Sequence, residues 1–216
     1  MIKIANKARE FDKIAREVFA PAYPIIAKQI LEKTQIKQGY CLDIGCGSGY
    51  LGLNIAQKSN LYVYAMDNDP QALEILKENI QQLGLGARVE ALSGNVHNIP
   101  LENDRVQLII SRGSMFSWEE PISAFNEVYR VLAPNGKGYI GGGFATAEIK
   151  KQIDEEMLKR NPNWLVHQNK KIGPKQPAKW RETMLETNIP EFDIIHNPVE
   201  MWIVFEKERD LLWKRF

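Results

Sequence analysis

The stretch that decides the fold runs from Cys41 to Gly52 and reads CLDIGCGSGYLG. A short apolar run ends there in a loop of alternating glycines. These glycines form G-x-G-x-G if the motif begins at Gly45, and G-x-G-x-x-G if it begins at Gly47. Glycine lets the backbone approach a ligand closely, and the first turn of a following helix offers unpaired N–H groups to negative charge. Either pattern predicts a strand-to-helix junction that binds a ligand.

The two patterns favour different ligands. G-x-G-x-x-G is the fingerprint of NAD and FAD enzymes, in which the first glycine stands at the strand end. Beginning at Gly47 would extend the strand across Gly45 and Cys46, so the pattern that begins at Gly45 fits better. Asp43 stands just before the loop, where its carboxylate would repel a pyrophosphate but would hold an ammonium group, directly or through water. Asp67 lies about 20 positions beyond either start, which suits both ligands.

The composition is that of an ordinary globular protein, with 44% hydrophobic and 25% charged residues. A length of 216 residues suits one compact domain. The formal charge of +1 provides no overall field that would gather nucleic acid. Two cysteines and three histidines lack the spacing of a disulfide framework or a zinc site, so we expect no metal and a reducing cytoplasm. The charged N-terminal stretch is not a signal peptide, and no apolar run is long enough to span a membrane.

Strands and helices alternate along the middle of the chain. Apolar runs predict strands at residues 39–44, 61–67, 88–94, 105–111 and 136–144. Helices are expected between them, at residues 49–59, from Asp69-Pro70 to Gly84, and at 121–132. Asp69 is a good N-cap, and Pro70 suits the first helical position. This alternation implies a parallel sheet with right-handed crossovers.

Other elements flank this alternating core. Helices are expected before it at residues 6–19 and 25–33, and after it at 147–159 and 179–187, with a connection at 161–177. The final stretch FDIIHNPVEMWIVFEK reads as two strands joined by a tight turn at Asn197-Pro198. Such a hairpin makes the last strand antiparallel to its neighbour.

The segment LDIGCGSGYLG resembles motif I of the class I S-adenosyl-L-methionine (SAM)-dependent methyltransferases, a strand that ends in Asp/Glu-x-Gly-x-Gly-x-Gly. The resemblance is strongest toward the small-molecule "type 11" branch, to which VHNIPLENDRVQLIISRGSMFSWEEP is similar. SRGS…W and YIGGGF are also similar to segments of uncharacterised archaeal and bacterial methyltransferases. The family implies an α/β, Rossmann-like sheet of seven strands, mostly parallel with an antiparallel last strand, helices on both faces and extra N-terminal helices.

The resemblance also implies a single methyltransferase domain over residues 1–216. Its expected parts are an N-terminal helical cap at 1–37, a SAM-binding core at 38–145, a helical cap at 146–190 and a terminal β-hairpin at 191–207.

The family assigns cofactor contacts to matching positions. The three glycines would pass beneath the methionine part of SAM, with Asp43 on its amino group and Asp67 on both ribose hydroxyls. Asn68 and Val96 would flank the adenine, and Asn95 would accept from the adenine amino group where the family usually has Asp. The complete set of expected contacts is Asp43, Gly45, Cys46, Gly47, Gly49, Asp67, Asn68, Asn95, Val96, His97, Ser111 and Arg112.

The segment SRGSMFSW follows the fourth strand and should face the transferred methyl group, because open α/β sheets bind ligands at the carboxyl ends of their strands. The acceptor-pocket candidates are Ser114, Phe116, Trp118 and Tyr23. The segment differs from Asp/Asn-Pro-Pro-Tyr, which argues against amino methylation of DNA or protein. No general base is evident, since His97 fits better as a loop residue beside the adenine. This favours an acceptor that is already a good nucleophile, such as a thiolate, an amine or a heavier chalcogen.

We therefore expect a cytoplasmic enzyme that transfers a methyl group from SAM to a small molecule and releases S-adenosylhomocysteine (SAH). Neither nucleic acid nor membrane is an expected partner, and a homodimer stays open. The alternatives are an RNA methyltransferase, a non-catalytic SAM-binding module and an NAD(P)-dependent oxidoreductase, although the Tyr-x-x-x-Lys pair of short-chain dehydrogenases is missing. A basic run comprises Lys170, Lys171, Lys175, Lys179 and Arg181. It could contact an anionic substrate or RNA, but we interpret it as a solvated surface.

Overall fold

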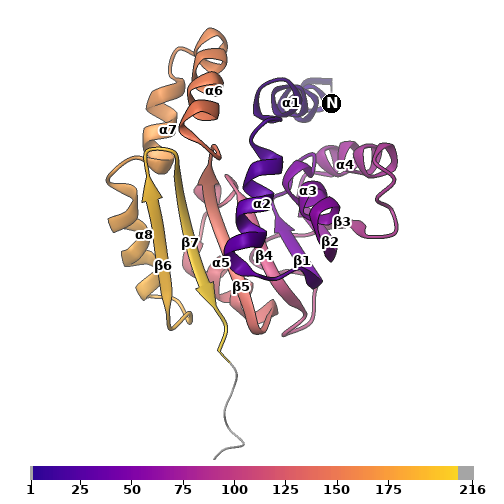
Figure 1. Ribbon diagram of the computed structural model, residues 1–216, viewed down its shortest axis with the longest axis vertical. Helices are drawn as coiled ribbons and strands as arrows, with labels where there is room; N and C mark the ends of the chain where they lie inside the picture. The colour runs from indigo at the N-terminus through magenta and orange to yellow at the C-terminus, as the bar shows by residue number, and fades with distance from the viewer. Residues whose placement is uncertain (1, 209–216) are drawn as a thin grey trace, which may run out of the picture.

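The computed structural model describes the backbone of residues 2–208 and the side chains of residues 7–208. Its centre is a seven-stranded sheet in the order β3-β2-β1-β4-β5-β7-β6 (Figure 1). The strands are β1 Gln38–Ile44, β2 Asn60–Asp67, β3 Val89–Ser93, β4 Val106–Arg112, β5 Leu132–Gly143, β6 Phe192–Asn197 and β7 Glu200–Glu206. The first five are parallel, and β7 runs antiparallel to both of its neighbours. The expected sheet is confirmed, including its antiparallel last strand.

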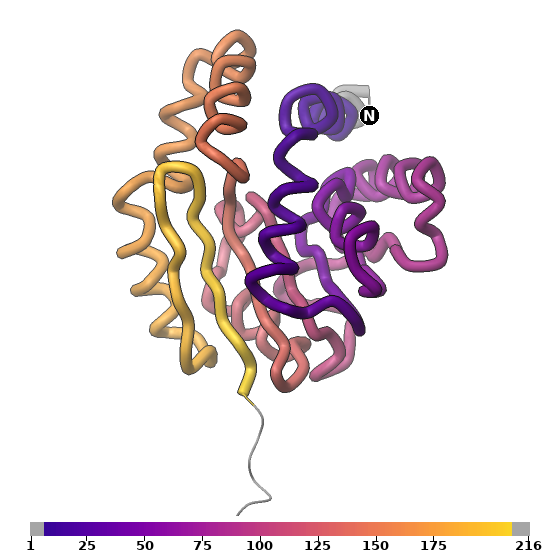
Figure 2. The backbone as a smooth tube through the Cα atoms, in the orientation of Figure 1, coloured from indigo at the N-terminus to yellow at the C-terminus, as the bar shows by residue number. Residues whose placement is uncertain are grey.

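Eight α-helices surround the sheet within the described residues. They are α1 Ile2–Ile14, α2 Tyr23–Thr34, α3 Tyr50–Lys58, α4 Pro70–Gln82, α5 Pro121–Val131, α6 Ala147–Arg160, α7 Trp164–Ile172 and α8 Gln176–Leu185. Helix α2 packs on α3, and α5 packs on α8. Figure 2 shows that α1 and the α6–α7 pair stand at the same end of the sheet. No helix in the described part of the chain is both long and apolar enough to cross a membrane.

The parallel strands are covered on both faces, which explains their continuous apolar runs. In β4, for example, Leu108, Ile109 and Ile110 are all fully buried. The strand order reverses at β1, which lies between β2 and β4. Ligands of open α/β sheets bind at such a switch point, beside the carboxyl ends of the strands. The fold thus places the glycine loop where the sequence predicts a ligand.

Two expected segments differ in the structure. The predicted connection at 161–177 contains helix α7 and the start of α8, because Trp164 is buried against the rings of Phe19 and Phe144, at 6.0 and 6.3 Å between centroids. The first predicted helix is α-helical only to Ile14. It continues as a π-helix, η1, over Ala15–Phe19, a form that is often found at functional sites.

The fifth strand also begins earlier than predicted, at Leu132 instead of residue 136. Residues 134–136 lie inside the strand as an irregularity, with Asn135 at φ +61°. The backbone N–H of Asn135 donates to the carbonyl of Lys207 at 2.7 Å. This bond joins the start of β5 to the residue after β7.

Candidate functional site

A cavity of about 830 Å³ opens at the carboxyl ends of β1, β2, β4 and β5. Its volume falls within the range of roughly 300–1,000 Å³ that is usual for small-molecule sites. Helix α1, η1 and α7 also contribute to its wall. Elements distant in sequence therefore enclose one site.

The glycine loop forms the floor of this cavity. Gly45, Gly47 and Gly49 have φ values of +63°, +54° and +84°, a left-handed conformation that side chains disfavour. A Cβ atom on Gly45 would lie 2.3 Å from Cβ of Ser114, whereas one on Gly47 would meet only Phe11, at 4.0 Å. The backbone at Gly47 therefore faces open space, where a ligand can lie directly on it.

Asp67 ends β2 beside this loop. Its Oδ2 accepts a hydrogen bond from the N–H of Gly47 at 2.8 Å, and its Oδ1 accepts from the N–H of Asp69 at 3.0 Å. A carboxylate has about four lone-pair positions, so two remain for a ligand. Asp67 lines the cavity and is held in a fixed orientation, as a bidentate acceptor for a diol requires.

Asp43 lies deeper in the wall of the cavity and is only 2% exposed. Its Oδ2 accepts from the N–H of Gly52 at 2.9 Å. Burial raises the pKa of Asp43 to about 7, against the opposing effect of the Gly52 hydrogen bond and with a further increase from the charge of Asp67. A cationic group in the cavity would stabilise the ionised carboxylate.

The residues expected at the adenine, Asn68, Asn95, Val96 and His97, all line the cavity. Oδ1 of Asn95 accepts from the backbone N–H of His97 at 2.9 Å and lies 2.8 Å from its Nδ1. An amide oxygen can only accept, so Nδ1 carries a proton. Nε2 of His97 is buried and has no partner among the described residues. It is an acceptor available to a ligand.

The four acceptor-pocket candidates also line the cavity. The hydroxyl of Ser114 donates to the carbonyl of Ile44 at 3.0 Å and is 2.6 Å from the hydroxyl of Ser111, so it fixes the loop after β4 against β1. Tyr23 is 9% exposed, and its ring centroid lies 5.4 Å from that of Tyr50. Phe116 and Trp118 provide an aromatic wall, with Trp118 packed against Phe125.

Two expected cofactor contacts, Gly49 and Ser111, are outside the cavity lining. Gly49 is the N-cap residue of α3, and Ser111 is fully buried beneath Ser114. Both support residues that line the site. Cys46 does line it, but burial raises the pKa of its thiol well above the ordinary value. It is therefore a protonated, unreactive member of the loop.

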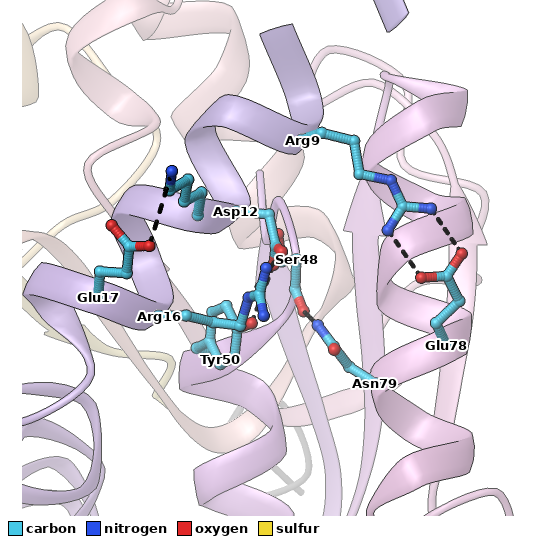
Figure 3. A network of polar contacts seen from close by, with 9 residues as sticks. Arg9, Asp12, Arg16, Glu17, Ser48, Tyr50, Glu78 and Asn79 are labelled. Atoms are coloured by element: carbon cyan, nitrogen blue, oxygen red, sulfur yellow. Dashed lines mark hydrogen bonds and ion pairs between the residues drawn. The ribbon is translucent and has the colours of Figure 1, made fainter. Parts of the chain in front are cut away.

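Hydrogen bonds and ion pairs fasten α1 over the cavity (Figure 3). Asp12 is 3% exposed and accepts from the hydroxyl of Tyr50 and from Nε of Arg16, both at 2.9 Å. Arg9 makes a bidentate ion pair with Glu78 of α4, at 2.6 and 2.8 Å. The helix that precedes the core thus closes the site beside the glycine loop.

Part of the wall was not predicted from the sequence. Phe19 is the last residue of the first predicted helix, and the helical spacing of apolar residues there is the only signal that could have pointed to it. Phe144, Trp164 and Lys171 also line the cavity. Trp164 and Lys171 lie on α7, which was predicted as a connection, so their approach to the site depends on a tertiary contact. Lys171, interpreted from the sequence as part of a solvated surface, is exposed but also lines the cavity.

Comparison with known proteins agrees with this geometry. The family model "Methyltransferase domain" matches residues 41–136. The chain is similar to a solved Methanococcus maripaludis protein assigned to the S-adenosyl-L-methionine-dependent methyltransferases, with 37% identity, a TM-score of 0.92 and coverage of 95% of this chain and 94% of that one. An Aquifex aeolicus SAM-dependent methyltransferase is 18% identical over 94% of this chain and 97% of that one, with a TM-score of 0.67, which shows a shared fold.

A curated relative is an uncharacterised methyltransferase-like protein of Schizosaccharomyces pombe, 31% identical over 137 residues, which are 62% of this chain and 51% of that protein. The chain thus spans about half the length of that relative. The likeness along nearly the whole Methanococcus chain shows the family: the chain belongs to the SAM-dependent methyltransferases.

The residues present fit SAM, the methyl donor of this family. The backbone at Gly47 is open to the cavity, Asp67 retains acceptor capacity, and Nε2 of His97 lacks a partner among the described residues. These features match an amino acid, a diol and an adenine in that order along the site. They also favour SAM over NAD or FAD, since Asp43 beneath the loop would repel a pyrophosphate.

Proposed function

We propose that the protein transfers the methyl group of SAM to a small-molecule acceptor that binds between the carboxyl ends of β4 and β5 and helix α7. The observation that carries this proposal is the continuity of the cavity. It extends from Asp67 and His97, past the glycine loop, to the aromatic wall of Phe116 and Trp118. Donor and acceptor would lie side by side in one enclosed space.

SAM supplies an activated methyl group, because its sulfonium is a good leaving group. The chain's own residues would bind, orient and exclude water. Asp67, Asp43 and His97 would fix the donor, while Phe116 and Trp118 would place the acceptor in line with the methyl group. Helix α1, held by Asp12, would keep water from the reacting atoms.

Among the described residues, no buried group in the acceptor half of the cavity is placed to remove a proton, and Glu119 and Lys171, which line the cavity, are exposed. His97 lies on the adenine side and is bonded to Asn95. Burial raises the pKa of Tyr23 and keeps its phenol protonated. This favours an acceptor that arrives as a nucleophile, such as a thiolate or an amine, or one whose proton leaves to water.

A small acceptor fits this enclosure better than RNA does. Helices α1 and α7 both reach over the site, and the net charge of +1 gives little attraction to a polyanion. The two cysteines, Cys41 and Cys46, are both free thiols, which is consistent with the reducing cytoplasm that we propose as the compartment.

Calorimetric titration of the full chain with SAH and with NADH tests the donor. We expect SAH to bind and NADH to give no heat, while the reverse would contradict the proposal. SAH release from SAM is then measured with a panel of small thiols, amines and phenols. Binding of SAH without turnover on any of them, together with salt-sensitive binding of tRNA, would favour the RNA methyltransferase instead.

A further inference from the structure

Two cations line the acceptor half of the cavity. Arg112 is the last residue of β4, and its Nε donates to the carbonyl of Gly143 at 2.9 Å. Lys171 is near the end of α7, with Nζ 5.8 Å from the ring centroid of Phe116. Neither side chain forms an ion pair with Asp or Glu within the described part of the chain. Both belong to the cavity wall.

The guanidinium of Arg112 is enclosed by aromatic rings. Its central carbon lies 5.1 Å from the ring centroid of Phe19, 5.2 Å from that of Tyr23 and 5.8 Å from that of Phe144. A guanidinium has five N–H donors. Only the Nε donor has a hydrogen-bond partner among the residues that the structure describes. The donors on the two Nη atoms therefore remain for a ligand.

The charges of this pair are poorly compensated. Burial lowers the pKa of Arg112, and burial together with the charge of Arg112 lowers that of Lys171. Aromatic faces stabilise a cation only partly, and a buried charge without a counter-ion is unfavourable. Arg112 is such a cation, and Lys171, whose side chain is exposed, adds a second positive charge on the same wall. Two cations there favour an anion between them, and the planar fork of Arg matches a carboxylate or a phosphate.

We propose that the methyl acceptor carries a carboxylate or phosphate group, held by Arg112 and Lys171 beside Phe116. This inference rests on the proposed methyl transfer. The anion would lie on the other side of β1 from Asp67, so the donor would face Asp43 and Asp67 and the acceptor would face Arg112 and Lys171. Glu119, exposed beside Trp118, also lines the cavity. The aromatic wall indicates that an apolar body joins the anion to the methylated atom.

SAM also has a carboxylate, and sequence analysis placed Arg112 among the cofactor contacts. The position of Lys171 favours binding of the acceptor's anionic group over binding of the SAM carboxylate. This residue lies on α7, against Phe116, and its pKa is coupled to the charge of Arg112. Helix α7 contacts β5, which is separated from the glycine loop of β1 by β4. Arg112 and Lys171 therefore lie on the side of the cavity away from Asp67, the carboxylate that would bind the ribose.

The test uses the full chain saturated with SAH and titrated calorimetrically with benzoate, phenyl phosphate and benzamide. These share an aromatic ring and differ in charge. We expect at least one anion to bind about 10-fold or more tightly than benzamide, and the better of the two identifies the acceptor group. Lys171→Met should weaken that binding by about 3- to 10-fold, and Arg112→Met by more. Lys170→Met, the same change on the neighbouring residue, which is outside the cavity lining, should leave it unaltered.

Equal binding of benzoate, phenyl phosphate and benzamide would overturn the proposal. So would an Arg112→Met variant that loses SAH affinity and keeps anion affinity, because Arg112 would then belong to the donor's carboxylate. If Arg112→Met fails to fold, Arg112→Lys and the rim variant Lys171→Glu decide the question by the same titrations. A wild-type chain that does not bind SAH would refute the proposed function itself, which is a separate outcome.

Discussion

Tyr50, the first residue of the helix after the glycine loop, donates a 2.9 Å hydrogen bond from its hydroxyl to Oδ1 of Asp12 in α1. Burial, and then Asp12, raise the pKa of Tyr50, so its phenol remains a donor. This bond joins the floor of the cavity to its cover (Figure 3). The closure of the site therefore depends on a side chain that sequence analysis did not assign.

Tyr50→Phe should weaken the attachment of α1 to the helix after the glycine loop without changing the volume of the cavity. We expect the free energy of unfolding to fall by about 1 kcal/mol, the usual value of one hydrogen bond. SAH affinity should fall by a few fold, since α1 closes the site less often. Urea denaturation and calorimetry measure the two effects. Tyr62→Phe is the control, because it removes a similar hydroxyl bond, to Glu90, on the exposed surface; equal effects of both changes on SAH affinity would contradict the role of Tyr50.

Asp67→Ala should remove the acceptor of the ribose diol. Two charge-assisted hydrogen bonds would be lost, so we expect SAH affinity to fall by about 100-fold. The variant also loses the bond to Gly47, so affinity alone does not isolate the diol. The 2′-deoxy analogue of SAH separates the two effects. It lacks one of the two hydroxyls that Asp67 would bind, so the losses from the variant and the analogue should be less than additive.

Glu74→Gln, an exposed acid-to-amide change on α4, is the control for Asp67 and should bind SAH normally. Full additivity between Asp67→Ala and the 2′-deoxy analogue would show that the carboxylate acts only on the loop.

Local chemistry explains which features the sequence could predict. The apolar runs specify strands that are buried on both faces, and Asp69 caps α4 as expected, accepting from the N–H of Gln71 at 2.9 Å. The glycine loop follows from residues that are adjacent in the chain. Its partner Asp67 could be placed because the carboxyl ends of neighbouring parallel strands meet at one edge of the sheet.

The rest of the site depends on contacts between distant segments. Helix α7 has few apolar residues at helical spacing, and Trp164 anchors it only because η1 and the residue after β5 supply the opposing rings. The link between Asp12 and Tyr50 joins segments 38 positions apart, one of them outside the core. No local pattern encodes such a pair. The same holds for the approach of Lys171 to Arg112.

The raised pKa of Asp43 predicts how stability varies with pH in the absence of ligand. Its carboxyl has a pKa of about 7 in the folded state and an ordinary value of 3.8. Between these values the folded chain holds a proton that the unfolded chain has lost, so stability falls as pH rises through this window and is constant above it. The total loss should be about 4 kcal/mol at most. The free energy of unfolding is measured across this pH range for the wild type and for Asp43→Asn. The difference isolates the contribution of Asp43, because the variant cannot ionise at this position.

The ammonium group of bound SAH should stabilise the ionised carboxylate of Asp43 and so lower its pKa. Binding near pH 6.5 should then release up to about one proton, and affinity should rise with pH until about 7. Calorimetry in buffers of different ionisation enthalpy measures the proton. Release that persists in Asp43→Asn would assign the effect to another group.

His97→Ala tests the adenine contact. Nε2 of His97 is the unpartnered acceptor, so we expect the wild type to prefer SAH over S-inosylhomocysteine, in which an oxygen replaces the amino group. A lost hydrogen bond to a buried acceptor should make this preference about 10-fold or more. His97→Ala should abolish it, and His167→Ala, an exposed histidine on α7, should not. If the preference for SAH survived in His97→Ala, the adenine amino group would be bound by Asn95 instead.

Substitution of single glycines separates the shape of the loop from its contact with the cofactor. Gly45→Ala would bring Cβ to within 2.3 Å of Cβ of Ser114, so we expect severe destabilisation. Gly47→Ala meets no protein atom closer than 4.0 Å. Gly47→Ala should lower the free energy of unfolding by only about 1–2 kcal/mol, because alanine disfavours the left-handed conformation. Its methyl group would nevertheless project into the cavity and reduce SAH affinity by about 10-fold or more.

Gly84→Ala provides the matched control, because Gly84 also has a positive φ, of +64°, with nothing within 4 Å of an added Cβ, and lies outside the cavity lining. It should show the same loss of stability as Gly47→Ala with unchanged SAH affinity. Thermal unfolding and calorimetry on the three variants measure both quantities. If Gly47→Ala bound SAH as tightly as Gly84→Ala does, the cofactor could not lie on the loop at Gly47, and the orientation of SAM in this cavity would have to be reversed.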